Sequence, residues 1–350
     1  MIRLDSASEE RATLLHERAI IVDALGWAYV ERPSAIIDRK DEIDRAVEAG
    51  VTASNQYLAS LDVDDFDAAI HKFWSYYGLL EVRADRTLLV ESTDDILRAK
   101  AEGKLGLIMG FQGASPIQND LAYLTIFQKL GLRVMGIAYN RRNLCGDGAQ
   151  EPEDRGLTAF GQVVVKSANR LGILIDLSHT GVRTSIDVLR LSAKPVVFSH
   201  SNVRSITNHY RNLTDEQIDL IAACNGVIGL STHAAFCRRE PGVRPTLDDY
   251  LDHLDYIVRR IGVDHVGVGT DMVTVGTLHE KIQSATFTRM VDPGFHTGFG
   301  GEGRFVEGFE NVGGFRNLTR GLVSRGYSDD DVLKVLGGNW LRVFGEAWAS

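Results

Sequence analysis

Short apolar runs rich in valine and isoleucine recur along the chain, separated by segments in which apolar residues follow a helical spacing. Runs such as IIVDA, LGLIMGF and GILIDL are apolar on both faces, as is typical of buried parallel strands. Eight runs are found, at 20–24, 51–54, 107–111, 134–138, 173–177, 196–198, 226–230 and 265–270. Their alternation with helical segments predicts an α/β protein whose parallel strands close into a (β/α)8 barrel of the TIM type.

The predicted helices have recognisable ends, with Ser92 and Thr214 in the positions of N-caps. Residues 272 to about 314 are instead rich in glycine, and we expect a long loop there at the catalytic face of the barrel. The segment SDDDVLKVLGGNW predicts a closing C-terminal helix followed by a Gly-Gly break. Because no repeat or change of composition marks a boundary, we expect residues 1–350 to form one barrel domain.

Composition and charge narrow the range of partners. The net charge is -9 and no cluster of lysine and arginine is long enough to follow a phosphate backbone, which argues against nucleic acid. No apolar stretch approaches the roughly 20 residues that span a bilayer, so we expect no membrane association. The N-terminus lacks a signal peptide pattern, and the three cysteines have no C-x-x-C spacing. These features favour a cytoplasmic protein and leave a homo-oligomer open.

In barrels of this type the functional groups follow the carboxyl ends of the strands. The strongest pattern there is the pair LIDLSH and PVVFSH, in which His179 and His200 each come two residues after a buried run. Two imidazoles on neighbouring strands can share one metal ion, since neutral imidazole is a common zinc ligand. The alternative is that both are hydrogen-bonded histidines without a metal.

Two further charged residues stand at candidate site positions. Asp271, in VGVGTDM, ends the last run, where a carboxylate can act as a metal ligand, a general base or both. Its alternative role is that of a turn residue. Arg211, in NHYRNLTDEQI, could bind a carboxylate through two parallel hydrogen bonds, or could be an ordinary surface arginine.

The segments GLTAFGQVVVKSANRLGILIDLSHTG, PVVFSHSNVRSITNHYRNLTDEQI and HVGVGTDM resemble the membrane (renal) dipeptidase family, peptidase M19, and the resemblance runs from about residue 20 to 348. It implies an amidohydrolase-like (β/α)8 barrel with two zinc ions that hydrolyses small dipeptides. It also implies that His179 and His200 bind one zinc. Asp271 would bind the other zinc and accept a proton, and Arg211 would contact the substrate carboxylate.

Four positions depart from the family pattern. The H-x-D pair after the first strand is replaced by Leu25 and Trp27, and the bridging glutamate by Gln112. Tyr139 stands where a histidine of the family contacts substrate. These changes remove two carboxylates and a nitrogen ligand, so we expect at most one zinc or other divalent metal ion per chain, or none.

We therefore predict a hydrolase of a small amide or dipeptide-like substrate with an at most mononuclear metal site at His179, His200 and Asp271. Asp271 and Tyr139 are its predicted catalytic residues. The predicted contacts to a carboxylate-bearing small molecule are Arg211, Gln112, Trp27 and Asn140. Two alternatives use the same barrel. One is a metal-free acid/base enzyme, a lyase or isomerase, and the other is a protein that binds a small ligand without catalysis.

Overall fold

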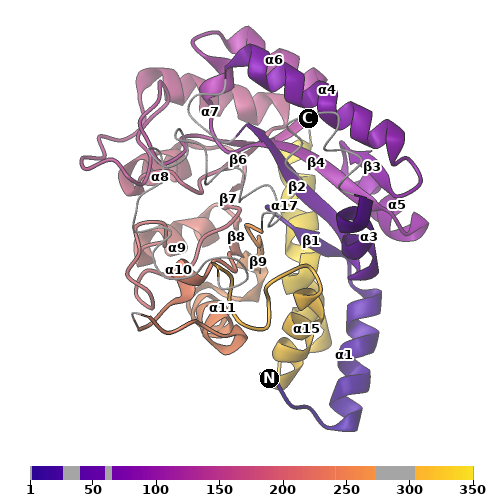
Figure 1. Ribbon diagram of the computed structural model, residues 1–350. Coiled ribbons are helices and arrows are strands. Elements are labelled where there is room, and N and C mark those ends of the chain that lie inside the picture. The colour runs from indigo at the N-terminus through magenta and orange to yellow at the C-terminus, as the bar shows by residue number, and fades with distance from the viewer. Residues whose placement is uncertain (1, 27–39, 60–64, 241, 273–303, 350) are drawn as a thin grey trace.

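The computed structural model describes residues 2–26, 40–59, 65–240, 242–272 and 304–349. Figure 1 shows a central group of strands with helices around it. Trp27 and residues 273–303 of the predicted glycine-rich loop lie outside the described residues, so what was expected of them stays a prediction.

The eight predicted runs all contain strands, which confirms the predicted architecture. The strands are β1 (Ile21–Asp23), β2 (Val51–Ala59), β4 (Leu105–Phe111), β5 (Leu132–Gly136), β6 (Leu174–Asp176), β7 (Val196–Phe198), β8 (Val227–Leu230) and β9 (Val266–Val268). Each is parallel to the next in that order. The short strand β3 (Thr87–Val90) was not predicted. It pairs with the first half of β4, while β5 pairs with the second half.

The barrel is nearly closed by contacts between β9 and β1. The Ala24 N–H donates to the Val268 carbonyl at 3.0 Å, and the Asp271 N–H donates to the Leu25 carbonyl at 3.0 Å. Beside them, the hydroxyl of Thr270 donates to the Asp23 carboxylate at 2.6 Å. The first and last strands are therefore joined at the same edge where the predicted site residues lie.

The helices alternate with the strands, as βαβ units require. They are α1 (Ser6–Arg18), α3 (Lys40–Glu48), α4 (Phe66–Val82), α5 (Thr93–Glu102), α6 (Leu121–Lys129), α7 (Ala159–Leu171), α8 (Val182–Leu191), α9 (Asp215–Ala223), α10 (Ala234–Cys237), α11 (Leu247–Ile261), α15 (Gly314–Ser324), α16 (Asp329–Leu333) and α17 (Asn339–Trp348). Ser92 and Thr214 cap α5 and α9 as predicted. None of the described helices is long and apolar enough to cross a membrane.

Helix α17, which follows the Gly337–Gly338 break, covers the amino ends of the barrel strands. Trp340, Val343 and Phe344 pack in one buried cluster with a side chain from each of the eight strands β1 to β8. The amide of Asn339 donates to the Val266 carbonyl at 2.8 Å, and the indole N–H of Trp348 donates to the Arg133 carbonyl at 3.1 Å. Since this helix occupies the amino end, the carboxyl end is left for the site.

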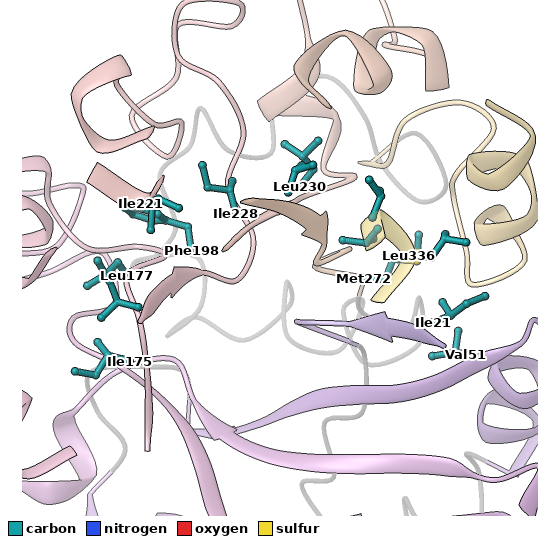
Figure 2. Packing of buried hydrophobic residues seen from close by; sticks show 14 of the residues in the cluster. Ile21, Val51, Ile175, Leu177, Phe198, Ile221, Ile228, Leu230, Met272 and Leu336 are labelled. Carbon is teal, nitrogen blue, oxygen red and sulfur yellow. The ribbon is translucent and has the colours of Figure 1, made fainter. Parts of the chain in front are cut away.

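A second buried layer packs between the strands and the surrounding helices. Figure 2 shows part of it, including Ile228 and Leu230 of β8, Ile21 of β1, Met272 and Leu336. These side chains are almost completely buried. Burial of apolar surface on both faces of the strands explains why the runs read as continuously apolar.

The contact between β9 and α17 leaves no room for a side chain at Gly267. A β-carbon there would lie 2.4 Å from Nε1 of the fully buried Trp340. Gly267→Ala should therefore lower the free energy of unfolding by about 1–3 kcal/mol. Gly345→Ala in α17 is the matched control, because its β-carbon would meet nothing closer than 3.8 Å. Thermal unfolding would measure both, and equal melting temperatures would contradict this packing.

Candidate active site

His179 and His200 lie side by side at the carboxyl ends of β6 and β7. Their ring centroids are 4.8 Å apart, and both residues are at most 5% exposed. His179 has a left-handed backbone conformation, with φ of +68°. Its carbonyl accepts hydrogen bonds from the N–H groups of Ala149 at 2.7 Å and Asn140 at 3.3 Å. The loop after β5 thus holds the backbone that aims the His179 ring.

The hydrogen bonds around His200 fix which ring nitrogen carries the proton. The Ser199 hydroxyl donates to Asp176 Oδ2 at 2.5 Å and contacts His200 Nδ1 at 2.7 Å. Because the hydroxyl proton is committed to Asp176, Ser199 must accept the Nδ1 proton of His200. His200 Nε2 then carries the lone pair. This nitrogen is buried and has no hydrogen-bond partner among the described residues.

His179 is fixed in the same tautomer by a different residue. Its Nδ1 lies 2.8 Å from Asn140 Oδ1, which can only accept, so Nδ1 donates and Nε2 carries the lone pair. Tyr139 stacks on the ring with centroids 4.0 Å apart. The amide oxygen of Asn140 thus orients His179, and the predicted contact of Asn140 with substrate stays a prediction.

The electrostatic surroundings keep both imidazoles neutral. Burial lowers the pKa of His179 and His200 well below the usual range, and the nearby positive charge of Arg211 lowers both further. Protons therefore do not compete for the two Nε2 lone pairs at neutral pH. Neutral rings whose other nitrogen is hydrogen-bonded are the form in which histidine binds metal ions.

Arg211 lies in the loop after β7 and is 3% exposed. Its guanidinium group donates one long hydrogen bond, at 3.4 Å, to the His200 carbonyl, and it stands over the ring of Phe236 at 5.4 Å. The buried Nε has no hydrogen-bond partner among the described residues. A buried cation with unused donors is suited to an anionic ligand.

Asp271 follows β9 with φ of +56°. Burial raises its pKa, while the charges of Arg304 and Arg211 lower it. The same burial raises the pKa of the Tyr139 and Tyr57 phenols above their usual range. Asp271 therefore lies within electrostatic reach of both guanidinium groups, and the two phenols stay protonated.

Leu25 and Gln112 were predicted to replace metal ligands, and neither side chain binds metal ions well. Leu25 is buried, and its carbonyl accepts the Asp271 N–H. Gln112 is buried at the end of β4, with its backbone against Gly136. Within the described residues, no three or more histidine, cysteine, aspartate or glutamate side chains are arranged to hold a metal ion together. The two imidazoles fit one ion, and Asp271 as its third ligand stays a prediction.

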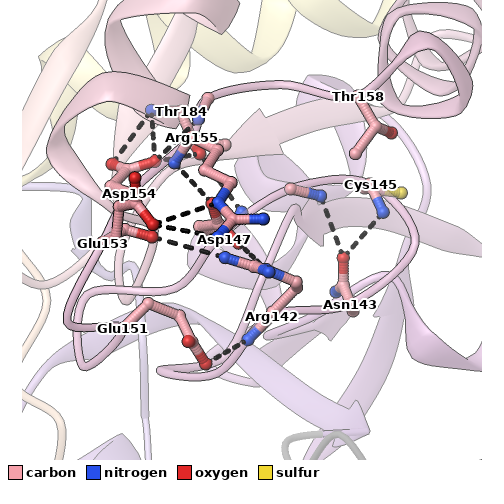
Figure 3. Close-up of polar contacts among 12 residues, drawn as sticks. Arg142, Asn143, Cys145, Asp147, Glu151, Glu153, Asp154, Arg155, Thr158 and Thr184 are labelled. Carbon is pink, nitrogen blue, oxygen red and sulfur yellow. Dashed lines mark hydrogen bonds and ion pairs between the residues drawn. The ribbon is translucent and has the colours of Figure 1, made fainter.

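The loop that carries Asn140 is braced by the carboxylates of Asp147, which is buried, and Asp154, which is partly exposed, as Figure 3 shows. Asp147 accepts from the Arg142 guanidinium and from the Arg155 N–H. Asp154 accepts from the Arg183 N–H at 2.6 Å and from the Thr184 hydroxyl at 2.7 Å, both at the start of α8. This network fixes the loop against the helix that follows His179.

Sequence reasoning missed four residues near this site: Asp176, Ser199, Tyr57 and Arg304. Asp176 and Ser199 had a visible signal, because Asp176 is a charged residue inside an apolar run and Ser199 directly precedes His200. Arg304 had none, because it lies in a glycine-rich segment whose spacing predicts no element.

A nearly closed parallel barrel with two imidazoles at its carboxyl end is the architecture of TIM-type metallohydrolases. Residues 43–291 and 291–349 match the family model of membrane dipeptidase, peptidase family M19. The chain belongs to this family.

Several relatives are similar over much of the chain. Dipeptidase tcpJ of Claviceps purpurea is 30% identical over 77% of this chain, which spans 57% of that protein. A solved amidohydrolase from Pseudomonas aeruginosa is 31% identical, with a TM-score of 0.84 over 97% of this chain and 99% of that one. A solved dipeptidase of family M19 is 25% identical, with a TM-score of 0.79 over 95% of this chain and 99% of that one.

The hydrogen bond between the Ser199 hydroxyl and His200 Nδ1 can be tested by measuring metal binding. Ser199→Ala removes the acceptor that orients His200 and should weaken zinc binding by roughly ten- to a hundredfold. Ser201→Ala is the matched control, because the Ser201 hydroxyl is buried without a partner among the described residues. Competition with a chromophoric chelator would measure both affinities. Equal zinc affinity in the two variants would contradict this role for Ser199.

Proposed function

We propose that the protein hydrolyses a small amide or dipeptide-like substrate and uses at most one divalent metal ion, zinc or a similar ion, at His179 and His200. The observation that carries the proposal is the pair of buried, neutral imidazoles, both with Nε2 lone pairs, beside the buried guanidinium of Arg211. The dipeptidases among its relatives support the reaction class.

Each residue has a distinct role in the proposed site. His179 and His200 would hold the metal ion, which when bound polarises a carbonyl or lowers the pKa of a water molecule. Asp271 would accept a proton, and its support is that it is a partly buried carboxylate influenced by the charges of Arg304 and Arg211. Arg211 would bind the substrate carboxylate, and the protonated Tyr139 phenol would donate a hydrogen bond.

Charge argues against a second ion. A dinuclear site needs carboxylates to offset two dications, whereas Leu25 is apolar and Gln112 is neutral. Arg211 adds a positive charge that already acts on both histidines. A second dication would therefore be repelled by the Arg211 guanidinium group and by the first ion, and Asp271 is the carboxylate that would have to bind it.

Hydrolysis should require metal and the Arg211 charge. We expect hydrolysis of a panel of L,L- and L,D-dipeptides that is lost after treatment with a chelator and restored by zinc. Arg211→Gln should raise KM by roughly ten- to a hundredfold for free dipeptides, because it removes charged hydrogen bonds, and should have little effect on C-terminally amidated ones.

Arg190→Gln, an exposed arginine of α8 paired with Glu216, controls for the general loss of a positive charge. Turnover that survives complete metal removal would contradict a metallohydrolase and favour the metal-free acid/base enzyme. Absence of turnover with every dipeptide, despite bound metal, would contradict the dipeptide-like substrate.

A further inference from the structure

Two loops at the carboxyl end of the barrel are joined by a hydrogen bond that the proposed site does not use. Gln150, in the loop after β5, donates through its side-chain amide to the hydroxyl of Tyr210, in the loop after β7, at 2.7 Å. Strand β6 lies between β5 and β7 in the sheet. The bond therefore connects the loops on either side of the strand that leads to His179.

On one side of this bond, the backbone around Gln150 holds His179. The Ala149 N–H donates to the His179 carbonyl at 2.7 Å, and the Gln150 N–H donates to the Asn140 carbonyl at 2.9 Å. The Asn140 side chain in turn accepts from His179 Nδ1 at 2.8 Å. The loop packs so closely that a β-carbon at Gly148 would lie 2.2 Å from the Asn140 carbonyl carbon. Gln150 is therefore fixed relative to the His179 ring.

On the other side, Tyr210 directly precedes Arg211, and one residue holds the backbone on both sides of Arg211. The Arg204 guanidinium group donates to the carbonyls of Tyr210 and Asn212, both at 2.8 Å. The amide of Asn212 donates to the Phe236 carbonyl at 2.9 Å. Because the loop is braced in this way, the position of Tyr210 fixes the position of Arg211.

The direct link between Arg211 and the two histidines is weaker. Its hydrogen bond to the His200 carbonyl, at 3.4 Å, is longer than the usual range for an N–H donor and an oxygen acceptor. The bond between Gln150 and Tyr210 is 2.7 Å long, and so constrains the separation of the two loops more tightly.

We infer that Gln150 and Tyr210 form a clamp that sets the distance from Arg211 to the two imidazoles, and with it the length of the substrate that the site selects. The inference rests on the proposed function, in which Arg211 binds the substrate carboxylate and the amide lies at the metal site. A ligand held at both ends binds tightly where its length matches the separation of its two anchors. Gln150 and Tyr210 are thus positioning residues, which act through His179 and Arg211.

Equilibrium binding tests the clamp without catalysis. Titration calorimetry of the zinc-loaded protein would use phosphonoacetate, 3-phosphonopropionate and 4-phosphonobutyrate, which offer a phosphonate to the metal and a carboxylate to Arg211 at increasing spacing. Methylphosphonate and butyrate each offer one of these groups. We expect the best-fitting spacing to bind at least about tenfold more tightly than either single-ended ligand. Gln150→Met should weaken that ligand by roughly three- to tenfold and the single-ended ligands by less than about twofold.

Tyr210→Phe tests the same bond from its other partner. Its effect should match that of Gln150→Met, and the double variant should bind the best-fitting ligand no more weakly than either single variant, because both changes remove one bond. The control variants are Gln162→Met, which changes an exposed glutamine of α7, and Tyr256→Phe, which removes a hydroxyl bonded to Asp215. Both controls should leave the binding of every ligand unchanged.

Three results of the calorimetry would overturn the inference. One is equal binding of all the ligands by the unmodified protein. Another is a best-fitting ligand whose affinity is the same in the unmodified protein, Gln150→Met and Tyr210→Phe. The third is a double variant in which the effects of the two changes add in full.

Hydrolysis separates this inference from the proposed function. Ala-Gly and Ala-β-Ala differ by one methylene between amide and carboxylate, and we expect Gln150→Met to reduce the discrimination between them in kcat/KM by roughly three- to tenfold. Hydrolysis with a discrimination that neither clamp variant changes would overturn the inference and leave the proposed function standing. Loss of the best-fitting ligand's advantage in both clamp variants, without hydrolysis of any dipeptide, would support the inference and count against the proposed function.

Discussion

Two buried carboxylates, those of Asp176 and Asp23, join the ends of neighbouring strands. Each accepts hydrogen bonds from the residue that directly precedes a site residue. Asp176 accepts the Ser199 N–H at 2.8 Å and its hydroxyl at 2.5 Å. Asp23 accepts the Thr270 N–H at 2.8 Å and its hydroxyl at 2.6 Å. The residue after Ser199 is His200, and the residue after Thr270 is Asp271. The hydrogen bonds that join neighbouring strands therefore also fix the backbone from which the side chains of His200 and Asp271 project.

In both arrangements, burial shifts the pKa of a polar group and hydrogen bonds decide its protonation. Burial raises the pKa of Asp23 to about 7, but the two hydrogen bonds from Thr270 oppose this rise. Around His200, the bond to Ser199 decides the tautomer, and burial keeps the ring neutral. A buried polar group needs its partners, so loss of one hydroxyl would disturb both the strand junction and the side chain that follows it.

The strands and the histidine pair could be predicted from sequence because both depend on local pattern. A parallel strand buried on both faces must be apolar throughout, and the Ser-His dipeptide follows two such runs. The short strand β3 was missed, because two of its four residues, Leu88 and Leu89, are only partly buried and the run does not stand out as core. The hydrogen bond of Asn140 to His179 and the nearness of Arg304 to Asp271 depend on loops that meet only in the folded barrel, so spacing along the chain predicts neither contact.

The metal content of the protein tests most directly whether the imidazole pair forms a mononuclear site. Elemental analysis of protein purified without chelator should find one divalent ion per chain, and His179→Asn or His200→Asn should lose it. Two ions per chain at full occupancy would contradict the site described above, as would one ion retained after both histidines are replaced.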